Sequence, residues 1–288
     1  MSFEDWTSGE IERLALDVYL KRPSPHQSIF KYVALNGKKS WDLFERTLNA
    51  CELVGSTYNA LNDPFELSPH LFNDLRPVTI ARALGEGASL SSRIKGEPWD
   101  PDVLFADVAR YVTDAQEAFA KIQQSARIIA FCDRSDSPLL WSHYANSYEG
   151  ACLHFTGGAF KRGLSNFGYV SYSAHRPTYP LSLALELSAR KRTGYSDDSL
   201  RQAESDKLVF YTKAADWAYE REVRIVYNAP RQTSLPFLPD GLLSVIIGPR
   251  MSSEDEAKLR DILARSKVPH LPVRRASLSS NSFSVEID

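Results

Sequence analysis

The sequence contains few cysteines and lacks the segments that mark secreted and membrane proteins. Its three cysteines, Cys51, Cys132 and Cys152, are odd in number and far apart, so it shows neither a disulfide framework nor a CxxC metal site. No stretch approaches about 18 apolar residues, and the N-terminus opens acidic, without the basic-then-apolar order of a signal peptide. We therefore expect a soluble, cytoplasmic protein that does not bind a membrane.

Neither sign of charge is in excess, and the common catalytic motifs are absent. The chain has 34 Lys and Arg against 36 Asp and Glu, a net charge of −2, which argues against nucleic-acid binding through bulk positive charge. There is no P-loop, no GxGxxG after a strand, no GxSxG elbow and no HExxH. His143 has neither a second His nor a Cys at metal-ligand spacing, so we expect no metal site.

What is present is the composition of an ordinary globular protein. The 288 residues include 43% hydrophobic and 24% charged side chains, enough to bury a core without disulfides. The sequence contains no repeat, no low-complexity segment and no obvious linker. We predict a single α+β domain over residues 1–288, with one mixed, possibly split, β-sheet, flanking helices and a mostly helical insertion at about 74–126.

The periodicity of apolar residues gives the expected elements. A helix capped by Ser40 carries Trp41, Phe44, Leu48 and Cys51 on one face, and a second helix begins at Asp100 and Pro101. The last third is expected to form a β-α-β unit, with a helix capped by Ser252 or Ser253 between strands at 242–248 and 270–278. Further strands are expected at 28–34, 53–58, 127–132, 150–155, 167–173 and 216–227, and helical structure at 181–214.

The stretch DWAYEREVRIVY, residues 216–227, is the most informative of the expected strands. Alternation places Glu220, Glu222 and Arg224 on one face and an apolar set, which includes Trp217 and Tyr219, on the other. Two carboxylates at i and i+2 lie about 7 Å apart along a strand, and Arg224 supplies a counter-charge. The face is either a solvated surface with an ion pair or one wall of a pocket.

Three further segments concentrate polar and aromatic residues. FKY places Lys31 and Tyr32 on the first strand, and LNDPFE contains Asn62 and Asp63 before Pro64, a turn signature that could also hold a ligand. In WSHYANSYEG, helical spacing puts residues 141, 144 and 145 on one side. For Trp141 the pattern favours a core position, and for His143 it favours a hydrogen-bonded structural histidine over a general acid or base. For Cys132 it favours a buried strand cysteine over a nucleophile.

These segments, in their order and spacing across about residues 29–250, resemble the bacterial family called domain of unknown function 2971. The resemblance rests on FKY, LNDPFE, the run from PLLWSHYANSYEG to ACLHF, KAADWAYEREVRIVY and VIIGP. One departure is FCDR at 131–134, where the family leads us to expect a serine and Asp133 stands instead.

A further resemblance is to ADP-ribosyltransferases, which have a split mixed sheet and a late strand that carries a glutamate, sometimes as Glu-x-Glu. It implies an intracellular effector that uses NAD, a small-molecule nucleotide ligand, either to transfer ADP-ribose to a macromolecule or to hydrolyse NAD. The resemblance to the bacterial family implies a toxin or phage-defence system. Glu222 or Glu220 would be the catalytic carboxylate, and His143 and Tyr144 are the other candidate catalytic residues. Tyr32 or Trp141 would stack on nicotinamide and Lys31 or Arg224 would hold the diphosphate, with Asn62 and Asp63 as further candidate cofactor-binding residues.

Two other functions remain open at this stage. The first is a metal-independent nuclease or other effector that acts on nucleic acid, with His143 and a glutamate as acid and base. The ADP-ribosyl transfer reaction would instead need a protein or nucleic-acid acceptor. The second is a non-enzymatic module that senses a ligand with the same residues.

Overall fold

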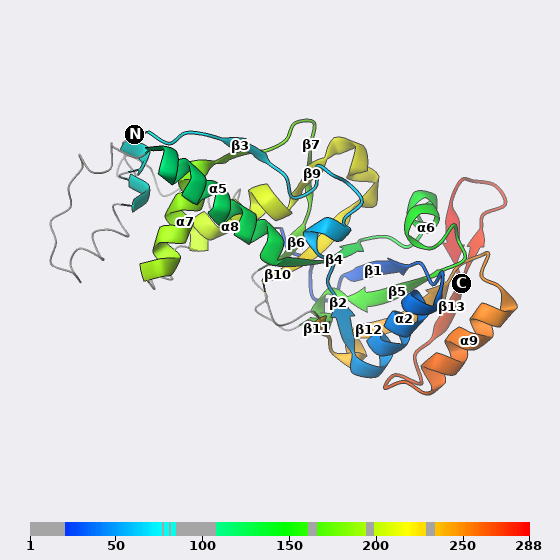
Figure 1. The fold of residues 1–288 in the computed structure, drawn as a ribbon. Coiled ribbons are helices and arrows are strands. Elements are labelled where there is room, and N and C mark those ends of the chain that lie inside the picture. The colour runs from blue at the N-terminus through cyan, green and yellow to red at the C-terminus, as the bar shows by residue number, and fades with distance from the viewer. Residues whose placement is uncertain are drawn as a thin grey trace. The chain divides into compact units, whose positions relative to one another are not determined.

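A computed structural model describes residues 21–76, 78–80, 82–84, 108–160, 166–193, 199–228 and 234–288, and it has the predicted α+β architecture (Figure 1). The chain divides into two compact units. Within the described residues, the sheet unit comprises 21–56, 127–170 and 216–288, and the helical unit comprises 57–126 and 171–215. The single-domain organisation stays a prediction, and residues 85–107 of the predicted insertion lie outside the described residues.

The sheet unit is built on an eight-stranded mixed sheet. Strand β1 lies near its centre, antiparallel to both β5 and β4, whereas β12 and β13 run parallel. The strands, in spatial order, are β14 (Val285–Ile287), β13 (Val273–Leu278), β12 (Leu242–Ile247), β5 (Ala151–Thr156), β1 (Ser28–Val33), β4 (Ala126–Cys132), β10 (Glu222–Asn228) and β6 (Phe167–Tyr169). A separate antiparallel pair joins β2 (Glu52–Val54) and β11 (Ser234–Pro236).

Each face of this sheet is covered by different helices, because side chains alternate along every strand. One face packs against α2 (Lys38–Ala50) and α9 (Ser253–Ala264), and the other packs against α6 (Pro138–Tyr144), as Figure 1 shows. In β1, for example, Ile29 belongs to the first core and Phe30 to the second. We call the second face the α6 face, and it carries most of the candidate site.

The sheet unit confirms most of the helix predictions and corrects one cap. Helix α9 begins after Ser252, whose Oγ accepts a hydrogen bond from the Asp255 N–H at 3.0 Å. In α2, Trp41, Phe44 and Leu48 are buried as predicted, but Gly37 precedes the helix and Ser40 lies inside the first turn, donating to the Gly37 carbonyl. The helix therefore starts two residues before the predicted cap.

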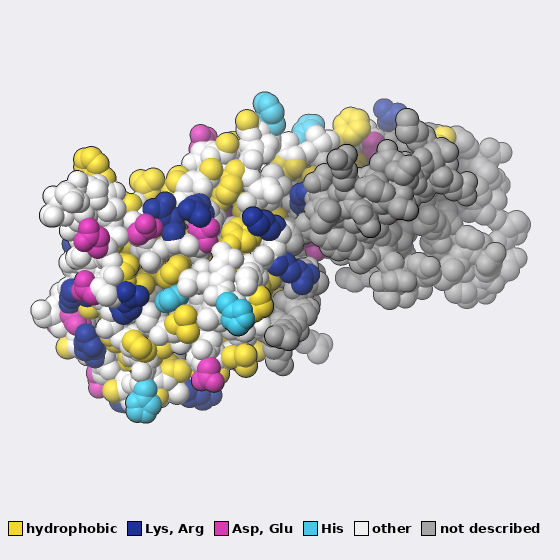
Figure 2. Space-filling view, turned by 180° about the vertical axis from the view of Figure 1, so that it is seen from behind, with side chains coloured by type: hydrophobic (Ala, Val, Ile, Leu, Met, Phe, Trp, Pro, Cys, Tyr) yellow, Lys and Arg dark blue, Asp and Glu magenta, His cyan; other side chains and the backbone are white. Residues whose placement is uncertain are grey.

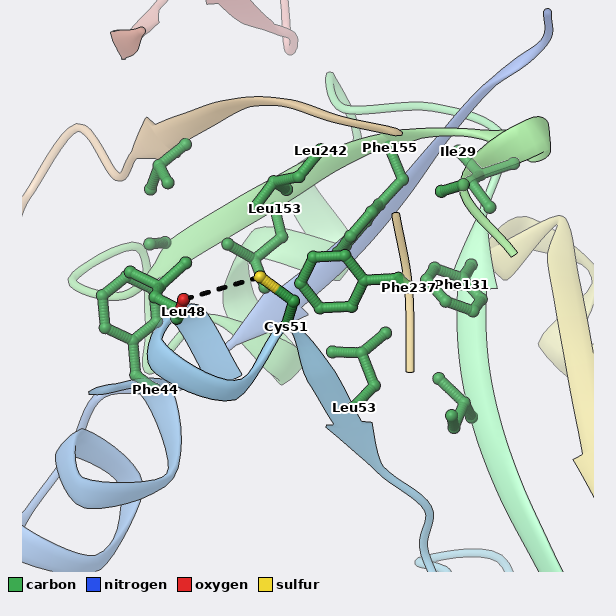
Figure 3. Packing of buried hydrophobic residues seen from close by; sticks show 14 of the residues in the cluster. Ile29, Phe44, Leu48, Cys51, Leu53, Phe131, Leu153, Phe155, Phe237 and Leu242 are labelled. Atoms are coloured by element: carbon green, nitrogen blue, oxygen red, sulfur yellow. Dashed lines mark hydrogen bonds between the residues drawn. The ribbon is translucent and has the colours of Figure 1, made fainter. Parts of the chain in front are cut away.

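The end of α2 shows how tightly this core is packed. Cys51 closes the helix with a left-handed backbone, φ 54°, and its Sγ donates to the Leu48 carbonyl at 3.8 Å (Figure 3). Around it lie aromatic and aliphatic side chains from β1, β4, β5 and the segment after β11. A free thiol in such surroundings acts as a small hydrophobic residue.

The helical unit packs α5 on α7 and α7 on α8. The described helices are α5 (Val108–Ser125), α7 (Leu181–Thr193) and α8 (Ser199–Phe210), and the short parallel strand pairs are β3 (His70–Phe72) with β8 (Thr178–Pro180) and β7 (Ser171–Ser173) with β9 (Thr212–Ala214). The predicted caps at Asp100 and Pro101, at the start of the second helix, lie outside the described residues. The strand predicted at 167–173 is two strands, because β6 pairs with β10 and β7 pairs with β9.

Asp206 in α8 gives a prediction about pH. Burial raises the pKa of this carboxyl to about 6, although Gln202 donates to Oδ1 at 2.8 Å. The folded state therefore binds the proton more tightly than the unfolded state, and Asp206 lowers stability as pH rises from about 4 to about 6. We expect Asp206→Asn to raise the free energy of unfolding by about 2–3 kcal/mol at pH 7, and by almost nothing at pH 3.5.

Urea unfolding of both proteins between pH 3.5 and 8 measures this difference. A gain from Asp206→Asn that is equal at all pH values would contradict the prediction. Glu204→Gln is the control for the change in the free energy of unfolding. Glu204 lies two residues from Asp206 and is more exposed.

Candidate functional site

Strand β10 places a buried ion pair on the α6 face. Val223 and Ile225 point into the opposite core, so Glu222 and Arg224 project from the other side. Arg224 is 0% exposed, and its Nε and Nη2 donate to Oε1 and Oε2 of Glu222 at 2.5 and 2.9 Å. A bidentate pair at this depth neutralises both charges. The pair occupies both carboxylate oxygens of Glu222, and the catalytic role of Glu222 and the diphosphate role of Arg224 stay predictions.

Glu220 does not lie on this strand, which corrects the predicted alternation. Residues Ala215–Glu220 form a 3-10 helix, η4, and Arg221 has a left-handed φ of 48° before β10 begins at Glu222. The left-handed residue breaks the period of two, so Glu220 and Glu222 are not neighbours on one pleat. For the same reason Tyr219 packs against the core of the α6 face instead of the opposite face.

Glu220 is held by a tyrosine from another segment. The Tyr144 hydroxyl donates to Oε1 of Glu220 across 76 residues of sequence, and Glu220 is 4% exposed. Tyr144 ends α6, a short helix that Ser137 caps by accepting from the Leu140 N–H at 3.4 Å. Residues 141, 144 and 145 all pack on one side of it, as predicted. The fold therefore fixes the position of this carboxylate.

His143 stands at the surface beside this pair. Its ring centroid lies 6.3 Å from that of Tyr144 and 6.3 Å from that of Tyr219. The side chain is exposed, and within the described residues no hydrogen bond to it is found. Helix α6 therefore turns this position toward solvent, and the favoured assignment of His143 as a hydrogen-bonded structural histidine stays a prediction.

Tyr32 and Trp141 form the floor of the same face. The two rings meet edge to face with centroids 5.1 Å apart, and Trp141 is 0% exposed with its Nε1 donating to the Ser135 carbonyl at 2.7 Å. The predicted core position of Trp141 is confirmed, and we assign it no ligand contact. Tyr32 donates to the Arg134 carbonyl at 3.3 Å, and burial raises the pKa of its hydroxyl.

Lys31 points away from this floor. It alternates with Tyr32 along β1, and its Nζ lies 5.9 Å from the ring centroid of Phe131, in the opposite core, and donates to the Ala130 carbonyl at 3.2 Å. Burial lowers the pKa of the ammonium, and the negative charge of Glu222 partly offsets this shift. The structure therefore does not bring Lys31 and Tyr32 to one surface.

Asn62 and Asp63 belong to the helical unit. Oδ1 of Asp63 accepts from the Phe65 N–H at 2.9 Å, the local bond expected of the predicted turn, and the residue is 6% exposed. Its Oδ2 is buried and has no hydrogen-bond partner among the described residues. A role in ligand binding stays a prediction for both residues.

The site prediction missed two charged residues that adjoin the strands β4 and β10. Arg221 donates from Nη2 to Oδ2 of Asp133 at 2.8 Å, and this contact joins the end of β4 to the start of β10. Oδ1 of Asp133 is buried and lacks a hydrogen-bond partner in the described part of the chain. The signal available in the sequence was Asp133 itself, which departs from the residue expected after Cys132.

Cys132 is not an activated thiol. Burial raises its pKa to about 12, and Sγ donates to the Arg134 carbonyl at 3.0 Å and to the Phe30 carbonyl at 3.6 Å. A nucleophilic cysteine requires the thiolate. The prediction of a buried strand cysteine is confirmed.

Over the described ranges, no group of three or more His, Cys, Asp or Glu is placed to hold a metal ion, and no described helix is both long and apolar enough to cross a bilayer. A search of curated proteins found no match, and neither did a search of solved structures. Residues 140–225, which include His143, Tyr144, Glu220 and Glu222, match the family described as a protein of unknown function (DUF2971).

Proposed function

We propose that the sheet unit binds NAD and cleaves its nicotinamide–ribose bond, with Glu220 as the catalytic carboxylate. The observation that carries this proposal is a buried carboxylate, oriented by the Tyr144 hydroxyl, next to the exposed ring of His143 and the partly buried ring of Tyr219. A nicotinamide ring can stack on such aromatic side chains. Glu222 is the weaker candidate because Arg224 already holds both of its carboxylate oxygens.

The chemistry requires a negative charge beside the ribose. When the bond from C1′ to the pyridinium nitrogen breaks, its electron pair leaves with nicotinamide and the ribose becomes oxocarbenium-like. A fixed carboxylate stabilises that developing positive charge. Water, or a nucleophilic group of an acceptor macromolecule, then bonds to C1′ and gives up a proton. The products are nicotinamide and either ADP-ribose or an ADP-ribosylated acceptor.

Nicotinamide release from NAD tests this proposal. We expect Glu220→Gln to lower the rate about 100-fold, since it removes the charge but keeps the shape. Tyr144→Phe should lower the rate about tenfold, because the carboxylate loses the hydroxyl that orients it. Glu149→Gln changes an exposed glutamate that accepts from Asn146 at 2.8 Å, and we expect it to leave the rate unchanged.

Unfolding temperatures of the variants show whether each is folded. Full nicotinamide release by folded Glu220→Gln would exclude this carboxylate from the reaction.

The two alternative functions make different predictions for the same proteins. A nuclease would degrade RNA or DNA without NAD and would lose activity in His143→Ala, and the exposure of His143 beside Tyr144 is the observation in its favour. On the face in Figure 2, however, Lys and Arg side chains are mixed with Asp and Glu over the described surface. A sensing module would bind its ligand with no turnover by the wild-type protein.

A further inference from the structure

Arg221 reaches solvent although both of its neighbours in sequence are buried. Its side chain is 55% exposed, whereas Glu220 and Glu222 are each 4% exposed. It follows Tyr219 and Glu220 directly in sequence and therefore lies at the edge of the candidate site. An arginine at this position can contact a ligand from the solvent side of the candidate site.

The backbone of Arg221 is strained to achieve this position. Its φ of 48° lies in the left-handed region, which costs free energy for any residue with a Cβ. The N–H of Arg221 donates to the Ala218 carbonyl at 3.3 Å, and β10 begins at the next residue. Strained residues that a fold nevertheless keeps are concentrated at functional sites.

Asp133 fixes the guanidinium by one nitrogen. Nη2 of Arg221 donates to Oδ2 of Asp133 at 2.8 Å, and the Asp133 side chain is 12% exposed. Among the described residues, Asp133 is the only hydrogen-bond partner found for this guanidinium. The remaining N–H donors keep the fork geometry that matches phosphate oxygens, and the carboxylate holds the group in place before a ligand arrives.

The two cations predicted to hold the diphosphate, Arg224 and Lys31, have other partners. Arg224 is 0% exposed and donates twice to Glu222. Lys31 donates to the Ala130 carbonyl on the opposite face of β1. The diphosphate-binding role predicted for one of these two residues therefore needs a different cation.

We propose that Arg221 binds the diphosphate of a nucleoside diphosphate ligand and that Asp133 is its positioning residue. This inference rests on the proposed function, in which the ligand is NAD. It adds a specificity: the site recognises the phosphates as well as the ring, and a nucleoside without phosphates binds more weakly.

Calorimetric titration with ADP and with adenosine tests the inference without requiring turnover. We expect the wild-type protein to bind ADP at least tenfold more tightly than adenosine. Arg221→Gln should weaken ADP binding at least tenfold and leave adenosine binding unchanged. Arg265→Gln is the matched control, because this side chain is 58% exposed and donates to Asp261 at 2.7 Å.

Arg221→Gly separates folding from binding. Glycine adopts a left-handed φ without strain, so we expect this variant to unfold at a higher temperature than the wild-type protein while it loses ADP affinity. Asp133→Asn should weaken ADP binding less than Arg221→Gln. Equal affinity of the wild-type protein for ADP and adenosine, no ADP binding, or full ADP affinity in Arg221→Gln would each overturn the inference.

The outcomes also distinguish the inference from the proposed function. Arg221-dependent ADP binding without nicotinamide release would contradict NAD cleavage and leave the diphosphate site standing. Nicotinamide release by a protein whose ADP affinity does not depend on Arg221 would support NAD cleavage and exclude the diphosphate site.

Discussion

Arg224→Met is expected to lower the free energy of unfolding by about 3–5 kcal/mol, because it leaves the Glu222 carboxylate buried without its cation. Both guanidinium bonds to Glu222 are short, and neither side chain is more than 5% exposed. An ion pair at this depth has a large desolvation cost, which the attraction between its two charges offsets. Equilibrium urea unfolding at pH 7 measures the loss.

Two further proteins make this test specific. In the double variant Glu222→Leu, Arg224→Met no charge of the pair remains, and we expect it to recover at least about 2 kcal/mol relative to Arg224→Met alone. Arg265→Met breaks a pair with Asp261, in which both side chains are more than half exposed, and a longer contact with Glu45 at 3.4 Å. It should cost less than about 1 kcal/mol. A double variant as unstable as the single one would mean that the packing of the arginine, and not the charge it pairs, accounts for the loss.

Gly248→Ala is expected to cost about 3 kcal/mol or more, because its Cβ would lie 2.0 Å from the Tyr148 carbonyl oxygen. The added Cβ would meet backbone atoms of Tyr148 and Gly150. Two hydrogen bonds hold the two segments together, from the Gly248 N–H to the Gly150 carbonyl at 2.8 Å and from the Arg250 N–H to the Tyr148 carbonyl at 3.1 Å. Neither the segment 148–150 nor the segment 248–250 can move away without breaking these bonds.

The segment that would be displaced is itself strained. Asn146, Ser147 and Tyr148 all have left-handed φ values, of 47°, 52° and 75°, and consecutive residues of this kind are unfavourable without support. They begin two residues after Tyr144, so we also expect Gly248→Ala to lower nicotinamide release more than its effect on stability explains. Gly248, in the motif Gly248-Pro249, thus supports the segment that follows α6, although it is not a residue of the candidate site.

Gly158→Ala provides the comparison for this prediction. Its Cβ would meet the Pro25 carbonyl oxygen at 3.0 Å, a contact that a small shift relieves, and we expect a cost below about 1 kcal/mol. Unfolding temperatures and urea midpoints of both variants are the measurement. Similar stabilities for Gly248→Ala and Gly158→Ala would show that the turn adjusts to the added methyl group.

Sequence periodicity located the elements that bury a regular apolar face. The stripe of Trp41, Phe44 and Leu48 predicted α2, and the cap at Ser252 predicted α9, because helix burial and capping depend on residues three and four apart. The alternation of Val223 and Ile225 likewise predicted β10. These signals are local and can therefore be recognised without a tertiary structure.

The same reasoning failed where the chain departs from regular geometry. EREVR was interpreted as one continuous strand, but Arg221 is left-handed and Glu220 belongs to a 3-10 helix. No glycine marks this break in the sequence. The side chain at the break, Arg221, bonds to Asp133, which is 88 residues away in sequence, so the local pattern does not reveal it. The strand predicted at 167–173 failed similarly, since its two halves have different partners.

The sequence by itself determined the α+β class, the helical faces and the segments that supply the candidate site, since all of these follow from local patterns of polarity. The tertiary structure decided the role of each charge. Glu222 is paired with Arg224, Glu220 is held by Tyr144, and Arg221 remains exposed. Whether a charged side chain is paired, buried or exposed depends on residues distant in sequence, and the spacing of charges along one strand does not contain that information.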